Sequence, residues 1–146
     1  MIGGVIVSHG KLAEELLNAL TIILGEAPNI VAVSIGWYDD VEDSRRKIKE
    51  SIKKVDRKNG VIIFTDMFGG TPSNISFSFL KENQIEIITG VNLPMLIKFV
   101  SLQRTNNLKE VAQKVVDQGK KNIHLASFLI SGKFKKNDRE KNRNKK

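Results

Sequence analysis

The stretch GGVIVSHG at residues 3–10 decides the fold. Its short apolar run predicts a buried strand over residues 2–8, and an amphipathic helical pattern follows almost at once, over residues 11–24. Ligands of open α/β sheets bind outside the carboxyl ends of the strands. The sequence therefore brings the His9 imidazole to the edge of the sheet where such folds carry out their chemistry.

Strand and helix patterns continue to alternate along the chain. We expect further strands over residues 30–35, 61–65 and 84–89, and further helices over residues 39–56, 71–82, 92–102 and 108–118. This order predicts an α/β fold built on a flavodoxin-like, open, doubly wound sheet with four parallel strands. A short strand over residues 122–127 is a candidate for the sheet edge.

Local signals predict where several helices begin and end. Asp39, with a glutamate three residues later, predicts a capping box at the start of the second helix. Thr71 before Pro72 predicts a threonine N-cap for the third helix, and Asn92 predicts the start of the fourth. Gly119 predicts the end of the last long helix.

The composition is that of an ordinary globular domain, with 40% hydrophobic and 27% charged residues in 146. The chain contains no cysteine, which excludes disulfide bonds and thiolate metal sites and fits a reducing compartment, so we expect a cytoplasmic protein. Its apolar stretches are too short to span a bilayer, and its N-terminus lacks the pattern of a secretory signal.

The net charge of +8 is concentrated at the end of the chain. Residues 133–146 carry eight basic and two acidic side chains, whereas the rest of the chain carries 16 and 14. We therefore expect one domain over residues 1–131 and a basic, disordered tail over residues 132–146. A structured nucleic-acid module would need a basic face with stacking aromatic side chains, so we expect no nucleic-acid partner.

Chemically reactive or polar residues follow three of the predicted strands, in the segments SHG (residues 8–10), TDMFGGTPSN (65–74) and TGVNLP (89–94). Because these strand ends meet at one edge of a doubly wound sheet, His9 and Asp66 could face each other. A carboxylate that accepts one ring N–H fixes the tautomer and leaves the other nitrogen free to attack. A structural, buried histidine is the alternative interpretation of His9 alone.

The turn after Asp66 has features that suit a phosphoryl group. Gly69 and Gly70 allow the backbone to turn tightly and to approach a ligand, and the helix start offers unpaired N–H groups. Thr71 and Ser73 add hydroxyl donors. Many strand–helix turns share this pattern, so a purely structural turn stays open as the alternative; the position three residues after Asp66 makes it a candidate for binding phosphate.

Other binding sites are disfavoured. The chain lacks the Gly-Lys-Ser/Thr ending of a nucleotide-binding loop, and a metal on His9 and Asp66 would need a third ligand that the sequence does not identify. We therefore expect neither metal nor cofactor. His124 is interpreted as structural or solvent-facing, and Trp37 and Tyr38 as packing or rim residues.

Together these segments closely resemble the mannose-type (mannose, fructose, sorbose) enzyme IIA component of the bacterial phosphoenolpyruvate-dependent sugar phosphotransferase system. The matching segments are VIVSHG (5–10), LGE (24–26), FTDMFGGTPSN (64–74) and GVNLPM (90–95). The resemblance covers roughly residues 1–130, in the order and spacing of the family.

The resemblance implies a phosphotransferase component in which His9 takes a phosphoryl group from the carrier HPr and passes it to enzyme IIB. Asp66 would orient the imidazole, and the turn over residues 70–73 would face the phosphate. It also implies a homodimer that exchanges an antiparallel edge strand, here over residues 122–127, and indirect association with membrane components IIC and IID. Met67 and Phe68 differ from some members, so the partner-facing rim is expected to differ too.

Three alternatives stay open. A regulatory domain of the same fold could use the same phosphohistidine to report phosphorylation to a non-transport partner. The phosphoryl donor of dihydroxyacetone kinase is a related variant, but its equivalent segment lacks the Gly-Gly-Thr-Pro turn. A flavodoxin-like module that only binds a ligand is the third. Some family members continue into a IIB domain, which we expect here on a separate polypeptide.

Overall fold

The structure is a computed structural model that describes residues 1–105 and 107–132. In chain order the elements are β1 (Gly3–His9), α1 (Leu12–Leu24), β2 (Ile30–Ile35), α2 (Val41–Val55), β3 (Val61–Thr65), α3 (Thr71–Phe77), β4 (Ile85–Thr89), α4 (Leu93–Leu102) and α5 (Leu108–Lys121). The alternation of strands and helices predicted from the sequence is confirmed.

The four strands form one parallel sheet in the order β2-β1-β3-β4. In this register His9 lies opposite Ile35 of β2, and Val7 lies opposite Thr65 of β3. After β1 the chain adds β2 on one side of it. It then crosses to the other side of β1 to add β3 and, beyond β3, β4. The boundary between β1 and β3 is therefore the topological switch point, where ligands of such sheets bind.

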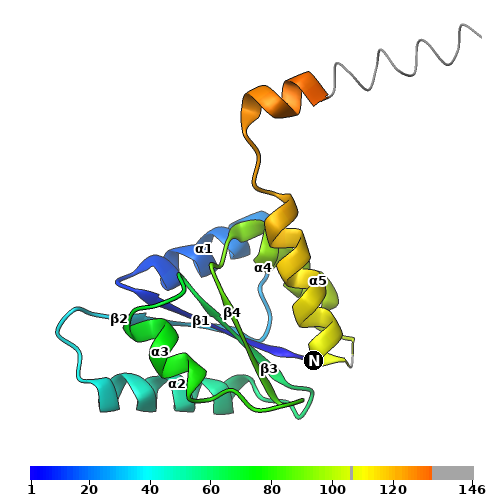
Figure 1. The fold of residues 1–146 in the computed structure, drawn as a ribbon. Coiled ribbons are helices and arrows are strands. Elements are labelled where there is room, and N and C mark those ends of the chain that lie inside the picture. Colours follow the sequence, from blue (N-terminus) through cyan, green and yellow to red (C-terminus); the bar gives the residue numbers. More distant parts are fainter. Residues whose placement is uncertain (106, 133–146) are drawn as a thin grey trace, which may run out of the picture.

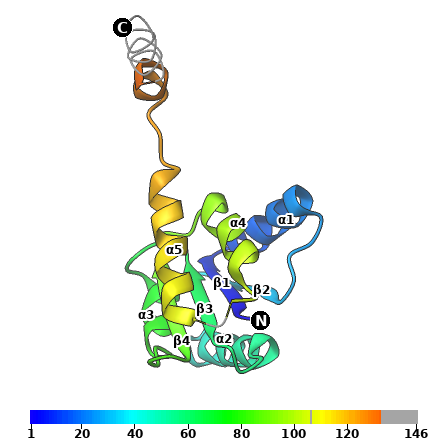
Figure 2. The same cartoon turned by 90° about the vertical axis from the view of Figure 1, so that its right-hand side faces the viewer.

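Helices cover both faces of the sheet. Helices α2 and α3 lie on one face, and α1, α4 and α5 lie on the other (Figures 1 and 2). Successive residues of β1 point to opposite faces, so Ile6 packs in a core with Phe64 and Phe99, whereas Val7 packs in the second core with Ile48 of α2. The rings of Phe64 and Phe99 meet edge-on, with centroids 5.1 Å apart. Burial on both faces explains the continuous apolar runs of these strands.

Two predicted helix starts are wrong by one residue. Asp40, not Asp39, is the N-cap of α2, and its side chain accepts a hydrogen bond from the Glu42 N–H at 3.4 Å. Asp39 Oδ2 instead accepts from the Gly36 N–H at 2.8 Å and holds the preceding loop. Gly70, not Thr71, is the N-cap of α3.

Helix α3 ends at Phe77, five residues earlier than predicted. The Ser76 hydroxyl donates to the Pro72 carbonyl at 2.6 Å, and the Ser78 hydroxyl donates to the Ile75 carbonyl at 2.6 Å. Serine hydroxyls that bond to the main chain in this way compete with helical hydrogen bonds. The chain then continues in tight turns to β4. The predicted start of α4 at Asn92 is confirmed, because its side chain accepts from the Met95 N–H at 3.0 Å.

Gly119 does not end α5, which continues to Lys121. A Cβ atom on Gly119 would lie 2.6 Å from Cε of Met95 in α4. The glycine therefore permits close contact between the two helices, and the stop signal inferred from it is wrong. The helix ends in Lys120 and Lys121, whose charges favour the carboxyl end of the helix dipole.

The strand expected over residues 122–127 does not form. Residues 123–125 have no regular structure, residues 126–132 are helical, and the whole segment is exposed. The segment extends away from the sheet (Figure 1), so no sheet edge lies beside it within the described part of the chain. Exchange between subunits stays a prediction. The predicted basic tail lies, beyond residue 132, outside the described residues. None of the described helices combines the length and apolar character needed to cross a membrane.

Candidate functional site

His9 and Asp66 meet at the switch point of the sheet. His9 is the last residue of β1, and Asp66 directly follows β3, its neighbour in the sheet. The side chain of His9 is 31% exposed and that of Asp66 is 10% exposed. The structure thus brings together the two residues that the sequence predicted to face each other.

The carboxylate of Asp66 holds both the ring and the main chain of His9. Its Oδ2 atom accepts hydrogen bonds from the ring Nδ1 at 2.7 Å and from the His9 main-chain N–H at 2.8 Å. Its Oδ1 atom accepts from the Met67 N–H at 2.9 Å. Because an ionised carboxylate can only accept, Nδ1 carries the proton and Nε2 keeps its lone pair.

Asp66 is held in its charged form. Burial raises the pKa of Asp66, but hydrogen bonds from the main chain and ring of His9, the charge of the imidazolium and the Met67 N–H outweigh burial and lower it below its ordinary value of 3.8. At neutral pH the site therefore contains a charged carboxylate bound to the Nδ1 atom of His9.

Gly70 borders the free nitrogen of His9. A Cβ atom at this position would lie 3.1 Å from Nε2 and 3.0 Å from Cε1, so any side chain would crowd the Nε2 edge of the ring. The φ angle of Gly70 is also +83°, which side chains rarely tolerate. The glycine keeps open the approach to Nε2.

The rest of the turn is divided between support and exposure. Ser73 is fully buried, and its Oγ accepts a hydrogen bond from the Gly69 N–H at 3.2 Å, so its hydroxyl braces the turn. Thr71 is exposed at the first position of α3. Of the four residues predicted to bind phosphate, Gly70 and Thr71 lie at the open side of the turn, and Gly69 and Ser73 fix its shape.

The loop on the other side of His9 is also tightly held. The buried Ser8 Oγ accepts from the Ala13 N–H at 2.7 Å and so satisfies a donor at the start of α1. The Gly10 N–H donates to the Ile35 carbonyl at 2.9 Å, which extends the β1–β2 pairing past His9. The main chain on both sides of the histidine is therefore fixed before any ligand arrives.

Exposed aromatic and apolar side chains flank the site in the sequence: Trp37 contacts His9, and Met67 and Phe68 follow Asp66 in the chain. The ring centroid of Trp37 lies 5.7 Å from that of His9, and the two rings are tilted by 37°. The exposed fraction is 86% for Trp37, 54% for Met67 and 76% for Phe68. The sequence indicated that Trp37 is a rim residue but missed its contact with His9. The parallel register of β1 and β2 could have indicated this contact. It pairs His9 with Ile35, and Trp37 follows Ile35 by only two residues.

The polar segment at the end of β4, residues 89–94, does not join this pair. Val91 donates its N–H to the Thr65 carbonyl at 3.0 Å, and Asn92 caps α4 and donates to the Gly119 carbonyl at 3.2 Å. These polar groups support the fold. His124 is exposed in the segment beyond α5. Among residues 1–105 and 107–132, no group of three or more histidines and carboxylates could hold a metal ion.

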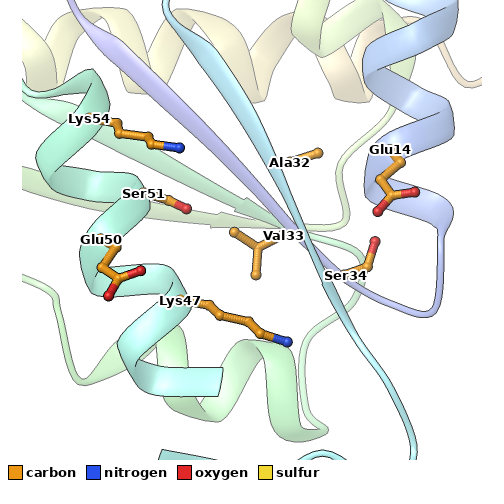
Figure 3. Close-up of a pocket in the computed structure, with 8 residues that line it drawn as sticks. All are labelled: Glu14, Ala32, Val33, Ser34, Lys47, Glu50, Ser51 and Lys54. Carbon is orange, nitrogen blue, oxygen red and sulfur yellow. The ribbon is translucent and has the colours of Figure 1, made fainter. Parts of the chain in front are cut away.

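An open cavity of about 300 Å³ lies elsewhere, between the outer edge of β2 and helices α1 and α2 (Figure 3). Its walls combine Lys47, Glu50 and Lys54 from α2 with Glu14 from α1 and Ser34 from β2. Neither member of the His9–Asp66 pair lines it. The mixed charges of this cavity do not favour one class of ligand. The His9–Asp66 pair at the switch point therefore stays the candidate functional site.

Comparison with known proteins identifies the family to which the chain belongs. The family described as PTS system fructose IIA component matches residues 3–116. The fructose-specific EIIA component of the PTS system of Bacillus subtilis is 32% identical over 122 residues, which cover 78% of this chain and 84% of that protein. The mannose-specific EIIAB component of Escherichia coli K12 is 30% identical over 82% of this chain, which spans only 38% of that longer protein.

Solved structures give the same answer for the fold. The crystal structure of phosphotransferase system component EIIA from Streptococcus agalactiae superposes with a TM-score of 0.79 and 25% identity, over 88% of this chain and 99% of that one. The profile match, the two relatives and the shared fold agree, and the chain belongs to the mannose- and fructose-type family of EIIA components of the phosphotransferase system.

Proposed function

We propose that the chain is a phosphohistidine carrier, in which His9 accepts a phosphoryl group from HPr and passes it to enzyme IIB during coupled sugar uptake and phosphorylation. One observation carries this proposal: Asp66 binds Nδ1 of His9 and leaves Nε2 at the open edge beside Gly70. A histidine held in this way is a nucleophile with a fixed tautomer and a fixed direction of attack.

The transfer step follows from that geometry. The Nε2 lone pair attacks phosphorus in line with the leaving group, an Nε2–P bond forms, and the bond between phosphorus and the donor nitrogen breaks. The electron pair of the broken bond leaves with the donor ring. The proton stays on Nδ1, so the phosphorylated ring is cationic, and the Asp66 carboxylate at 2.7 Å stabilises that charge. In the transfer to enzyme IIB, the accepting group of IIB attacks phosphorus, the Nε2–P bond breaks, and its electron pair returns to Nε2 of His9.

We assign the turn after Asp66 two roles in this step. Gly70 and Thr71, on its open side, face the phosphoryl oxygens, and the Thr71 hydroxyl can donate to them. Gly69 and Ser73 keep the turn in shape through the hydrogen bond from the Gly69 N–H to Ser73 Oγ. Preorganised donors of this kind stabilise charge without having to reorganise during the reaction.

We further propose that the protein works as a homodimer in the cytoplasm and reaches the membrane components IIC and IID only indirectly. The exposed segment beyond α5 supports a partner copy, since it presents Ile123, Leu125 and Phe128 to solvent at 75%, 61% and 75%. Strand β4 forms one edge of the sheet and could pair with such a segment from a second subunit.

A labelling experiment tests the carrier function. The purified chain is incubated with enzyme I, HPr and phosphoenolpyruvate, and the phosphate is located by mass spectrometry. We expect one acid-labile phosphate on His9, its absence in His9→Ala, and its retention in His124→Ala, the matched control that removes the other histidine. A His9→Ala variant that still accepts phosphate, or a wild-type chain that accepts none, would contradict the proposal.

A further inference from the structure

Trp37 is the one tryptophan of the sequence, and it lies against the reactive histidine. It belongs to the loop between β2 and α2 and is 86% exposed. Its ring centroid is 5.7 Å from that of His9, within the range of aromatic pairs. Burial of the indole therefore does not explain its position, and the contact with His9 does.

The loop holds Trp37 in place without help from the indole itself. The Gly36 N–H donates to Asp39 Oδ2 at 2.8 Å, and the Asp39 N–H donates back to the Gly36 carbonyl at 3.2 Å. Lys47 Nζ lies 3.9 Å from the same Asp39 oxygen. Because Ile35 pairs with His9 in the sheet, this braced loop starts at the level of the imidazole. The main chain that carries Trp37 is thus braced at the level of the His9 ring, while most of the indole stays exposed.

We propose that Trp37 is a positioning residue for phosphotransfer, whose indole packs against the His9 ring and stabilises it in the phosphorylated, cationic state. This inference rests on the proposed carrier function. The ring gains a positive charge when Nε2 bonds to phosphorus and Nδ1 keeps its proton. The π face of tryptophan attracts cations whose distance is below about 6 Å, and at an exposed site the effect on an equilibrium is about two- to fivefold.

A second role for an exposed tryptophan is to anchor the partner protein, and thermodynamics separates the two roles. A contact made only in the complex changes rates and complex affinity. It cannot change the equilibrium between the free phosphorylated and unphosphorylated proteins, because the complex does not occur in that balance. A contact with the His9 ring acts on the free protein and changes this equilibrium.

The experiment measures the equilibrium constant for phosphoryl exchange between HPr and this chain, using wild type, Trp37→Ala, Trp37→Phe and Tyr38→Ala. Tyr38 is the next residue of the same loop and is fully exposed, so its variant is the matched control. We expect Trp37→Ala to shift the equilibrium about two- to fivefold toward phosphorylated HPr. Trp37→Phe should restore part of the loss, and Tyr38→Ala should leave the equilibrium unchanged.

Fluorescence gives a second readout that a purely structural role would not produce. Because the sequence has a single tryptophan, the tryptophan emission of the chain comes from Trp37, and we expect the emission of the chain, separated from HPr and enzyme I, to change when wild type is phosphorylated but not when His9→Ala is treated in the same way. Trp37→Ala and Tyr38→Ala with equal exchange equilibria would overturn the inference. A wild-type chain that acquires no phosphate on His9 would instead overturn the carrier function itself.

Discussion

One oxygen atom of Asp66, Oδ2, accepts hydrogen bonds from both the main-chain N–H and the ring Nδ1 of His9, at 2.8 and 2.7 Å. The carboxylate therefore fixes the backbone and the ring of the histidine together. Rotation of the ring about its bond to Cβ would break the bond to Nδ1 and leave a largely buried charge without that partner. Such a loss is costly, so the reactive edge is held in a single direction.

Removal of the Asp66 carboxylate should slow transfer and leave the fold intact. In Asp66→Ala the ring loses its charged acceptor, and hydrogen bonds of this type contribute about 1.5–3 kcal/mol, so we expect the rate of phosphoryl acceptance to fall about 10- to 100-fold. Rapid-quench measurement of acceptance from HPr tests the rate, and circular dichroism tests the fold. An unchanged rate would remove Asp66 from the mechanism.

The stability contributed by Asp66 should depend on pH in one direction. Burial raises the pKa of Asp66, but its hydrogen bonds and the charge of His9 lower it below 3.8 in the folded state. A carboxyl group whose pKa is lowered by folding contributes stability above its ordinary pKa, and this contribution disappears as the pH falls through the folded value. We expect the difference in free energy of unfolding between wild type and Asp66→Asn to shrink as the pH falls below about 4.

Urea denaturation at a series of pH values measures that difference. The comparison with Asp66→Asn cancels the titration of the other acidic groups. A difference that grows on acidification would show that the carboxyl group is stabilised in its neutral form.

Replacement of Gly70 should separate backbone strain from obstruction of His9. Gly69 and Gly70 both have positive φ angles, +88° and +83°, so alanine at either should strain the backbone and destabilise the fold, by about 1–3 kcal/mol. Only Gly70→Ala puts a methyl group about 3 Å from the reactive edge of the ring, whereas a Cβ on Gly69 would meet open space within the described chain. We expect Gly70→Ala alone to reduce phosphorylation of His9, by more than about tenfold.

Thermal denaturation and the labelling assay together test this pair of variants. Equal labelling of the two would show that the space beside Nε2 does not matter for the reaction.

The contact between Gly119 and Met95 should be visible in a double-mutant cycle. A Cβ on Gly119 would lie 2.6 Å from Met95 Cε, so Gly119→Leu should overpack the interface of α4 and α5 and cost about 1–3 kcal/mol in free energy of unfolding. In a Met95→Ala background the cost should fall, because the cavity accepts part of the leucine. Urea denaturation measures all four proteins, and additive effects would exclude the contact. Phosphorylation of His9 should stay at the wild-type level.

Strands and helices were predictable here because burial on both faces of the sheet requires continuous apolar strands, and surface helices need one apolar stripe. The end of α5 was not predictable, because the glycine at position 119 makes room for the Met95 side chain of α4 and does not form a turn that ends the helix. The start of α2 was ambiguous for a different reason: Asp39 and Asp40 are adjacent, and either could cap the helix. Only the loop to Gly36 decides between them.

The proximity of His9 and Asp66 was predictable because parallel strands deliver their ends to one edge. The environment of the pair was not. Ser73 carries a suitable hydroxyl, but its burial depends on how α3 packs, and no local pattern reveals it. The contact of Trp37 with the imidazole depends on the register between β1 and β2, which places residues of two distant segments at the same height.

The switch point has a consequence for assembly of the molecule. His9 belongs to the N-terminal β1–α1–β2 portion, and Asp66, which binds its ring, comes from the portion that begins with β3. Neither portion contains both residues, so the His9–Asp66 pair forms only after the two portions have packed together at the boundary between β1 and β3. A chain in which only the first portion is ordered would carry the imidazole without the carboxylate that binds its Nδ1 atom.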